Sequence, residues 1–302
     1  MKYNFEYSEH CNMCGAPSSE AKILGKRMNL SQGKKPQKKV GIATTVVKCK
    51  NCDLIYPNPM PVPESLDQHY GTPSESYWTP EYFKIEQSYF AHQINTFFKL
   101  FGKTNADQKL KALDIGAGIG KCMVALDNAG FDAQGIEPSE PFYEKAIERT
   151  GISKSRLQML PIEEADYPKN TFDFITFGAV LEHLYDPAES IRSTMKWLKP
   201  GGLVHIEVPS SRWFISKIIN FFYSIRGLDY VTNVSPMHSP FHLYEFGLKS
   251  FEELAKKDNF EIVHYNYEVC KTYMPKPVDW FVVPYMRKTN SGMQLEIWLR
   301  KK

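Results

Sequence analysis

The chain has 302 residues, of which 42% are hydrophobic and 24% are charged, a balance typical of a folded globular protein. Its net charge of +3 is too small to require a polyanionic partner. No stretch approaches the roughly 20 apolar residues that a membrane-spanning helix needs, so we expect no transmembrane segment. Residues 1–20 contain no apolar segment of the secretory kind, and we therefore expect a cytoplasmic protein with reduced cysteines.

Two pairs of cysteines near the start of the chain have the same spacing. Cys11 and Cys14 form one pair, Cys49 and Cys52 form the other, and two residues separate the members of each. Such a turn places both sulfurs on one side of a tight loop, and two turns of this kind complete a tetrahedral zinc site. We predict a structural Zn²⁺ ion, because four thiolates leave no open position for a substrate. Disulfides, free thiols, or an iron or redox-active site are the alternatives.

The surroundings of these pairs indicate a small zinc-ribbon-like domain. A strand is expected at residues 40–48, leading into the second pair, and Gly15 permits a tight turn after the first pair. The four prolines within residues 57–63 cannot continue a helix or a central strand. We therefore place a domain boundary there and assign residues 1–60 to the zinc-binding domain.

From residue 109 onwards, strand and helix signals alternate, which indicates βαβ units and a mainly parallel sheet. A strand at 111–115 runs into the glycine-rich loop 116–120 and a helix at 121–128, and a second strand at 131–136 ends in Glu137. An acid at that strand tip can accept hydrogen bonds from both hydroxyls of a ribose. The glycine spacing departs from the G-x-G-x-x-G pattern of dinucleotide dehydrogenases, because the third glycine comes one residue early, at Gly120.

Three segments then resemble one family. Residues 113–120, Leu-Asp-Ile-Gly-Ala-Gly-Ile-Gly, resemble motif I of class I S-adenosylmethionine-dependent methyltransferases. Residues 172–187 resemble the family's fourth-strand block, with its Leu-Glu-His and Asp-Pro elements, and residues 198–206 resemble the block leading into strand five. The cysteine pairs followed by Asn-Pro also resemble a bacterial subgroup with an N-terminal zinc domain, which includes sugar C-methyltransferases.

The resemblance implies an α/β fold with a Rossmann-like, seven-stranded sheet. Its last two strands, at about 260–269 and 293–299, would form an antiparallel hairpin at the sheet edge. Residues 109–302 would be the methyltransferase domain, with helices at 187–198 and from Ser250, whose Ser-x-x-Glu pattern has the form of a capping box.

The resemblance also implies contacts with S-adenosylmethionine. Gly116, Ala117 and Gly118 would pass under its methionine part, and Glu137 would hold its ribose. The complete set expected to bind the cofactor is Asp114, Gly116, Ala117, Gly118, Gly120, Glu137, Pro138, Ile162, Glu163, Phe177 and Gly178.

Within that set, two pairs occupy defined positions. Ile162 and Glu163 would flank the adenine, and Phe177 and Gly178 would wall the sulfonium side. Many relatives have an aspartate before the adenine segment, where this chain has Pro161. Glu163 or a backbone group would then bond the adenine amine.

Two histidines are candidates for a general base. His183 follows the fourth strand, at the mouth of the expected cofactor site; its alternative role is to cap the next turn. Sugar C-methyltransferases have a Glu-His pair in a loop comparable to the one that contains His242, and here Phe241 stands in place of the glutamate. His238 is a weaker alternative.

Two aromatic segments have no fixed assignment. Residues 61–108 read as a linker and helical cap, and the aromatic side chains of residues 77–101 could close over the cofactor or pack on the core. A lid-like insertion is expected at about 210–246. Its apolar stretch, residues 212–226, favours a substrate lid or a homodimer surface, with a buried helix or a membrane-surface helix as alternatives.

The leading functional interpretation is methyl transfer to a small-molecule acceptor. A nucleotide-linked sugar, a surface-polysaccharide component and a secondary-metabolite precursor are the classes considered, and methylation at oxygen, nitrogen and carbon all stay open. The alternative is an RNA-modifying methyltransferase that contacts nucleic acid through the zinc domain and a run of basic residues. This run consists of Lys34, Lys35, Lys38 and Lys39, and we interpret it first as a solvated loop. The low net charge argues against nucleic acid, and the glycine loop with Glu137 argues against a non-catalytic scaffold.

Overall fold

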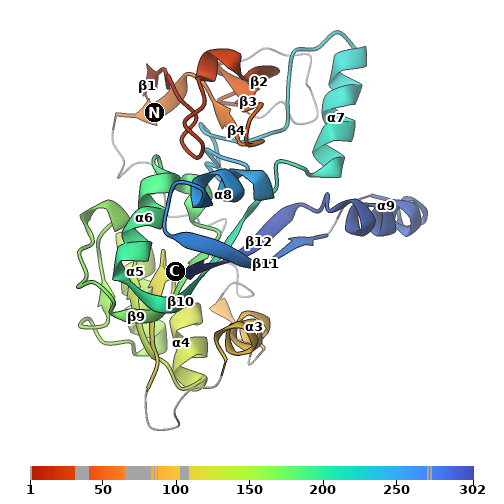
Figure 1. Cartoon of the computed structure of the whole chain (residues 1–302). Helices are drawn as coiled ribbons and strands as arrows, with labels where there is room; N and C mark the ends of the chain where they lie inside the picture. Colours follow the sequence, from red (N-terminus) through yellow and green to blue (C-terminus); the bar gives the residue numbers. More distant parts are fainter. Residues whose placement is uncertain are drawn as a thin grey trace.

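A seven-stranded sheet forms the centre of the computed structural model, and the N-terminal residues form two smaller sheets beside it (Figure 1). The structure describes residues 2–30, 41–64, 83–84, 86, 88–102, 109–270, 272 and 274–302. The basic run at 34–39 and the aromatic residues Tyr77, Trp78 and Tyr82 lie outside the described residues.

The large sheet has the strand order β11-β12-β10-β9-β6-β7-β8. Its strands are β6 (Lys111–Ile115), β7 (Asp132–Ile136), β8 (Leu157–Gln158), β9 (Phe172–Gly178), β10 (Leu198–Pro209), β11 (Phe260–Glu268) and β12 (Gln294–Lys301). Strands β6 to β10 pair in parallel, whereas β12 runs antiparallel to both β10 and β11. This confirms the expected α/β class and the antiparallel edge pair.

Helices cover both faces of this sheet, because parallel strands bury side chains on each side. The helices α3 (Ala91–Phe101), α4 (Lys121–Asn128) and α5 (Glu140–Thr150) share one apolar cluster with Phe174. The helices α6 (Pro187–Trp197) and α8 (Leu248–Ala255) share the other with Ile175. Successive residues of β9 thus point to opposite faces, as strand geometry requires.

Helix α8 begins two residues before the predicted start. Ser250 lies inside its first turn, and its hydroxyl accepts a hydrogen bond from the backbone N–H of Gly247 at 3.4 Å. The serine therefore caps the helix from within, which moves the start to Leu248. Helix α6 ends at Trp197, just before the Pro-Gly-Gly segment expected to stop it.

The N-terminal region contains two antiparallel sheets. One pairs β1 (Tyr3–Glu6) with β5 (Met60–Pro63), and the other has the order β2 (Lys22–Met28), β3 (Ala43–Lys48), β4 (Ile55–Pro57). A short 3-10 helix, η1 (Ser18–Glu20), precedes β2. The prolines of residues 57–63 lie in or between β4 and β5, which are both edge strands, where a missing N–H group is tolerated.

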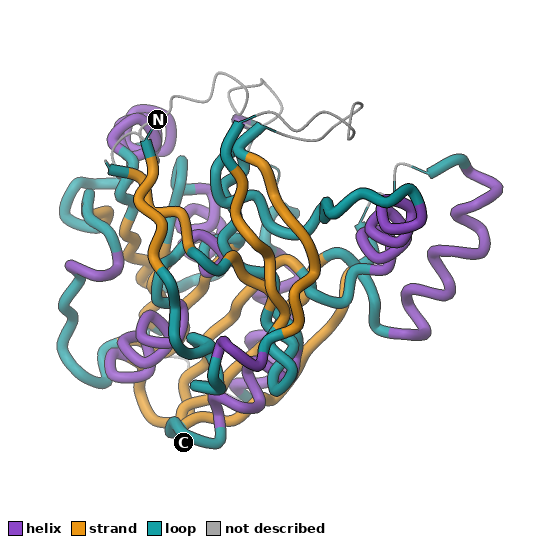
Figure 2. The backbone as a smooth tube through the Cα atoms, turned by 90° about the horizontal axis from the view of Figure 1, so that it is seen from above, coloured by secondary structure: helices purple, strands orange, loops and turns teal. Residues whose placement is uncertain are grey.

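Two helices project from the same side of the molecule, as Figures 1 and 2 both show: α7 (Phe214–Ile225) and α9 (Lys276–Thr289). The rings of Phe214 and Tyr285 join them, with centroids 4.7 Å apart. Helix α9 connects β11 to β12 and was not anticipated. On α7, Phe221 and Ile225 are 67% and 62% exposed, so the expected homodimer through residues 212–226 stays a prediction. Among the described residues, no helix has the length and apolarity to cross a membrane.

Candidate functional site

The loop between β6 and α4 requires glycine at several positions. Gly116, Gly118 and Gly120 have φ angles of +70°, +54° and +78°, which disfavour residues with a side chain. A Cβ atom added to Gly116 would lie 2.5 Å from Cγ2 of Val180, in the segment that follows β9. The N–H groups of Gly116 and Ala117 both donate to the carbonyl oxygen of Ile136 at 2.9 Å. The loop is thus fastened to the end of β7.

Glu137 follows directly after β7 and is almost completely buried. Its Oε2 accepts the N–H of Gly118 at 2.7 Å, and its Oε1 accepts the N–H of Ser139 at 2.8 Å. Burial raises the pKa of Glu137 to about 7, although both hydrogen bonds act in the opposite direction. The carboxyl group links the glycine loop to the residue that precedes α5, where vicinal hydroxyl groups of a ligand could donate to it.

Asp114 lies beside Glu137 near the end of β6. Its Oδ2 atom is buried and has no hydrogen-bond partner among the described residues. Burial, and then the charge of Glu137, raise the pKa of Asp114 to about 7. An acceptor atom of this kind fits a ligand that carries positive charge or N–H donors.

The other predicted cofactor residues differ in exposure. Ile162 is buried and Glu163 exposed on the 3-10 helix η2 (Ile162–Glu164), which Pro161 precedes, and Pro138 is half-buried. The side chain of Phe177 is fully buried in the core cluster under α6 and α8, so any contact at that position falls to its backbone. Gly178 is exposed and has open space where a side chain would be.

A separate surface hollow of about 730 Å³ lies between α8 and β11, lined by residues that include Leu248, Phe260 and Tyr265. None of the predicted site residues lines it. We therefore base the site on the glycine loop and the strand ends.

Both candidate bases approach a third side chain, Glu182. This residue lies with His183 on the 3-10 helix η3 (Leu181–His183), just after β9. The Nε2 atoms of His183 and His242 are 3.9 and 3.8 Å from Oε1 of Glu182. The two imidazole rings are 5.0 Å apart between centroids. Sequence reasoning missed Glu182, although its place next to His183 could have indicated it.

The electrostatics of this group follow from burial. Burial raises the pKa of Glu182 to about 8. Burial, together with the neighbouring His183, lowers the pKa of His242 to about 3. At neutral pH the His242 imidazole is therefore uncharged, and in this state its affinity for a proton is low.

Backbone contacts hold the His242 loop against η3. The N–H of Leu243 donates to the carbonyl oxygen of Glu182 at 2.8 Å, and Nδ1 of His183 lies 3.2 Å from the carbonyl oxygen of Phe241. His238 takes no part in this cluster, and its Nδ1 atom lies 3.0 Å from the carbonyl oxygen of Ser239. The structure thus brings together two of the three histidines.

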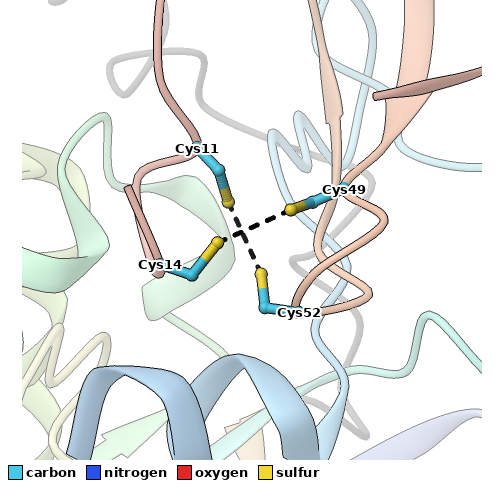
Figure 3. A group of neighbouring side chains, drawn as sticks. All are labelled: Cys11, Cys14, Cys49 and Cys52. Atoms are coloured by element: carbon cyan, nitrogen blue, oxygen red, sulfur yellow. Dashed lines mark hydrogen bonds between the residues drawn. The ribbon is translucent and has the colours of Figure 1, made fainter. Parts of the chain in front are cut away.

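The four cysteines of the predicted zinc site point towards one centre (Figure 3). All four are buried and free of disulfides, and the Sγ atoms of the pairs Cys11–Cys52 and Cys14–Cys49 are 3.5 Å apart. Each turn is followed by a residue with positive φ, Gly15 at +71° and Asp53 at +63°. The N–H of each donates back to the first cysteine of its pair, at 2.8 and 3.1 Å.

Comparisons with known proteins show which family the chain resembles. A family model described as a methyltransferase domain matches residues 82–265, more than half of the chain. A ubiquinone biosynthesis O-methyltransferase from Methylococcus capsulatus is 37% identical over 97 residues, which are 31% of this chain and 41% of that protein. The Bordetella avium enzyme of the same name is 29% identical over 157 residues, 49% of this chain and 60% of that protein.

The matched segments therefore span less than two thirds of the length of these two relatives. Among solved structures, a SAM-dependent methyltransferase from Archaeoglobus fulgidus superimposes with a TM-score of 0.50 and 16% identity. The superposition covers 76% of this chain and all of that one, and it shows the fold alone.

Proposed function

The chain belongs to the methyltransferase-domain family, and on that premise we propose that it transfers a methyl group from S-adenosylmethionine to a small-molecule acceptor. The observation that supports this proposal most is the buried Glu137, bonded to the N–H groups of both Gly118 and Ser139 beside the glycine loop. This arrangement is suited to hold a ribose next to a tight backbone turn.

The side chains at this edge of the sheet support S-adenosylmethionine as the proposed cofactor. In the proposed arrangement Glu137 holds the ribose, and Gly116, Ala117, Gly118 and Gly120 shape the turn under the methionine part. The unpartnered Oδ2 of Asp114 suits the positive charge and N–H donors of that part. The remaining proposed contacts are those of Pro138, Ile162, Glu163, Gly178 and the backbone of Phe177.

Bound S-adenosylmethionine supplies an already activated methyl group. The protein therefore has to align the acceptor and exclude water, and it has to receive a proton if the acceptor carries one. His242 is the proposed base, because its imidazole is only partly buried and lies 3.8 Å from Oε1 of Glu182, in the cluster just after β9. Glu182 and His183 position it through the contacts described above.

A structural zinc ion is the proposed occupant of the cysteine cluster. Tetrahedral Zn–S bonds of about 2.3 Å place sulfurs about 3.8 Å apart, close to the 3.5 Å found between opposed cysteines here. Four thiolates complete the coordination, so this ion would stabilise the N-terminal region and take no part in the reaction. The division into domains at residues 1–60, 61–108 and 109–302 is part of the same proposal.

The acceptor classes proposed are those named from the sequence: a nucleotide-linked sugar, a polysaccharide component or a secondary-metabolite precursor. Both ubiquinone biosynthesis relatives are named O-methyltransferases, which supports oxygen among the three acceptor atoms left open. RNA is the less favoured acceptor, since the net charge is only +3.

Release of S-adenosylhomocysteine tests the acceptor class. The zinc-loaded protein is incubated with S-adenosylmethionine and either a small-metabolite extract or total RNA. We expect release with the metabolites, and loss of most of it in His242→Ala while S-adenosylhomocysteine binding is kept. Release that depends on RNA alone would contradict a small-molecule acceptor, and unchanged turnover in His242→Ala would remove this residue from the mechanism.

A further inference from the structure

A second group of polar side chains is buried on the sheet face under α3, apart from the Glu182 cluster. Its members are His205 and Glu207 on β10 and Glu296 on β12. The Nε2 atom of His205 lies 3.6 Å from Oε1 of Glu207 and 3.4 Å from Oε1 of Glu296. The side chains of His205 and Glu296 are 0% and 1% exposed, and that of Glu207 is 23% exposed. One imidazole thus faces two carboxyl groups away from bulk water.

Hydrogen bonds from outside the group fix the orientation of each member. Nδ1 of His205 is 2.9 Å from the hydroxyl oxygen of Thr176. Trp298 Nε1 donates to Oε1 of Glu296 at 3.0 Å, and Gln93 Nε2 donates to Oε1 of Glu207 at 2.7 Å. Metal-bound histidines and carboxylates are held by outer partners of this kind.

Two atoms of the group are poorly satisfied. Nε2 of His205 faces only the two carboxyl groups, without a hydrogen bond of ordinary geometry, and the buried Oε2 of Glu296 has no hydrogen-bond partner among the described residues. The exposed His92 approaches Oε2 of Glu296 only to 3.9 Å. A buried carboxyl oxygen without a partner is costly, and a cation bound between the imidazole and the two carboxyl groups would satisfy it.

We propose that His205, Glu207 and Glu296 bind one divalent metal ion. Donor atoms about 2.1 Å from a metal lie roughly 3.0–3.4 Å apart, which small side-chain movements reach from the distances seen here. One imidazole and two carboxylates suit ions such as Mn²⁺, Fe²⁺ or Zn²⁺. Three protein ligands leave a coordination position open, unlike the four-cysteine cluster.

The ion would lie at the edge of the sheet where methyl transfer is proposed. Glu207 pairs in register with Gly178, the last residue of β9, and His205 pairs with Thr176. The open position would take an oxygen of the acceptor, a hydroxyl or a carboxylate. This role rests on the proposed function, whereas metal binding itself does not.

Manganese binding tests the proposal. Mn²⁺ is titrated into zinc-loaded protein, whose thiolate site is already filled, and free Mn²⁺ is measured by electron paramagnetic resonance. We expect one Mn²⁺ per chain and at least tenfold weaker binding in Glu207→Gln and Glu296→Gln. Glu182→Gln, which alters the other Glu–His cluster, is the matched control and should bind as the wild type does.

The melting temperature and zinc content of each variant are measured to check that it folds. If Glu296→Gln does not fold, the test rests on Glu207→Gln, which changes the least buried of the three ligands. The proposal would be overturned if the wild type does not bind Mn²⁺, or if both ligand variants bind it as tightly as the wild type does. It would also be overturned if only Glu182→Gln weakens binding. S-adenosylhomocysteine binding is measured on the same samples. Binding of that compound without Mn²⁺ would refute the metal site alone, and the reverse would refute the cofactor site alone.

Discussion

Buried carboxyl groups are concentrated around the ends of β6, β7 and β9. Asp114, Glu137 and Glu182 are each at most 6% exposed, and burial raises the pKa of all three. The sequence predicts Glu137, because an acidic residue directly after the second strand can accept hydrogen bonds from a ribose. It does not predict Glu182, because the contact with His242 joins residues 60 positions apart and exists only once the loop has folded back.

The pH dependence of stability in a Glu182 variant tests whether this carboxyl group is buried. In the unfolded chain its pKa is near the ordinary value of about 4.3, whereas in the folded protein it is about 8. The folded state therefore binds the proton more tightly, and the stability this contributes is lost as pH rises through 8. Glutamine cannot ionise, so between pH 5 and 9 the wild type should lose stability relative to Glu182→Gln, on the order of a few kcal/mol.

Urea unfolding at several pH values measures this difference. Glu189→Gln, on the exposed side of α6, is the control and should follow the wild-type profile. Parallel profiles for the wild type and Glu182→Gln would show that this carboxyl group is not buried as described.

At the scale of elements, the N-terminal strands hold the loop that contains His242. The N–H of Lys26, on β2, donates to the carbonyl oxygen of Asp229 at 2.7 Å. Ile55, on β4, exchanges two backbone hydrogen bonds with Glu245, at 2.9 and 3.0 Å. The hydroxyl of Ser250, in α8, donates to the carbonyl oxygen of Cys52 at 2.8 Å. The cysteine turns are therefore coupled to the proposed base.

Zinc removal should loosen this loop more than the cofactor site. Structural zinc contributes directly to folding free energy, so a chelator acting on the cysteine cluster should free β2, β4 and the attached segment. We expect faster amide hydrogen exchange in residues 229–246, with residues 111–137 as the internal control, and loss of turnover before loss of S-adenosylhomocysteine binding. Equal exchange in both segments with and without zinc would contradict this coupling.

Helices and strands can be predicted from the sequence where the apolar residues follow a single helical or strand periodicity. The strands and the helix around the glycine loop follow from buried apolar runs and from the glycines themselves. Helix α9 is not evident in the sequence because Pro284 interrupts its pattern, and β5 is not evident because prolines argue against a strand unless it lies at an edge. In each case the deciding information is the position of the element in the whole fold.

At the scale of the whole molecule, one hydrophobic core spans the N-terminal region and the large sheet. Met13, Leu54 and Tyr56 belong to the same cluster as Leu184 and Phe246. The sequence places a boundary at residues 57–63 from local proline content, but it does not reveal that the two sides share a core. The zinc site, the His242 loop and the glycine loop are therefore expected to respond to one another.

Calorimetric titration with S-adenosylhomocysteine tests the central claim most directly. The account predicts one binding site per chain, weakened roughly 10- to 100-fold in Glu137→Gln, because charged hydrogen bonds to the ribose are lost. Glu140→Gln, an exposed residue at the start of α5, should leave the affinity unchanged. A wild-type protein that does not bind, or a Glu137→Gln variant that binds equally well, would contradict the assignment of the cofactor to this site.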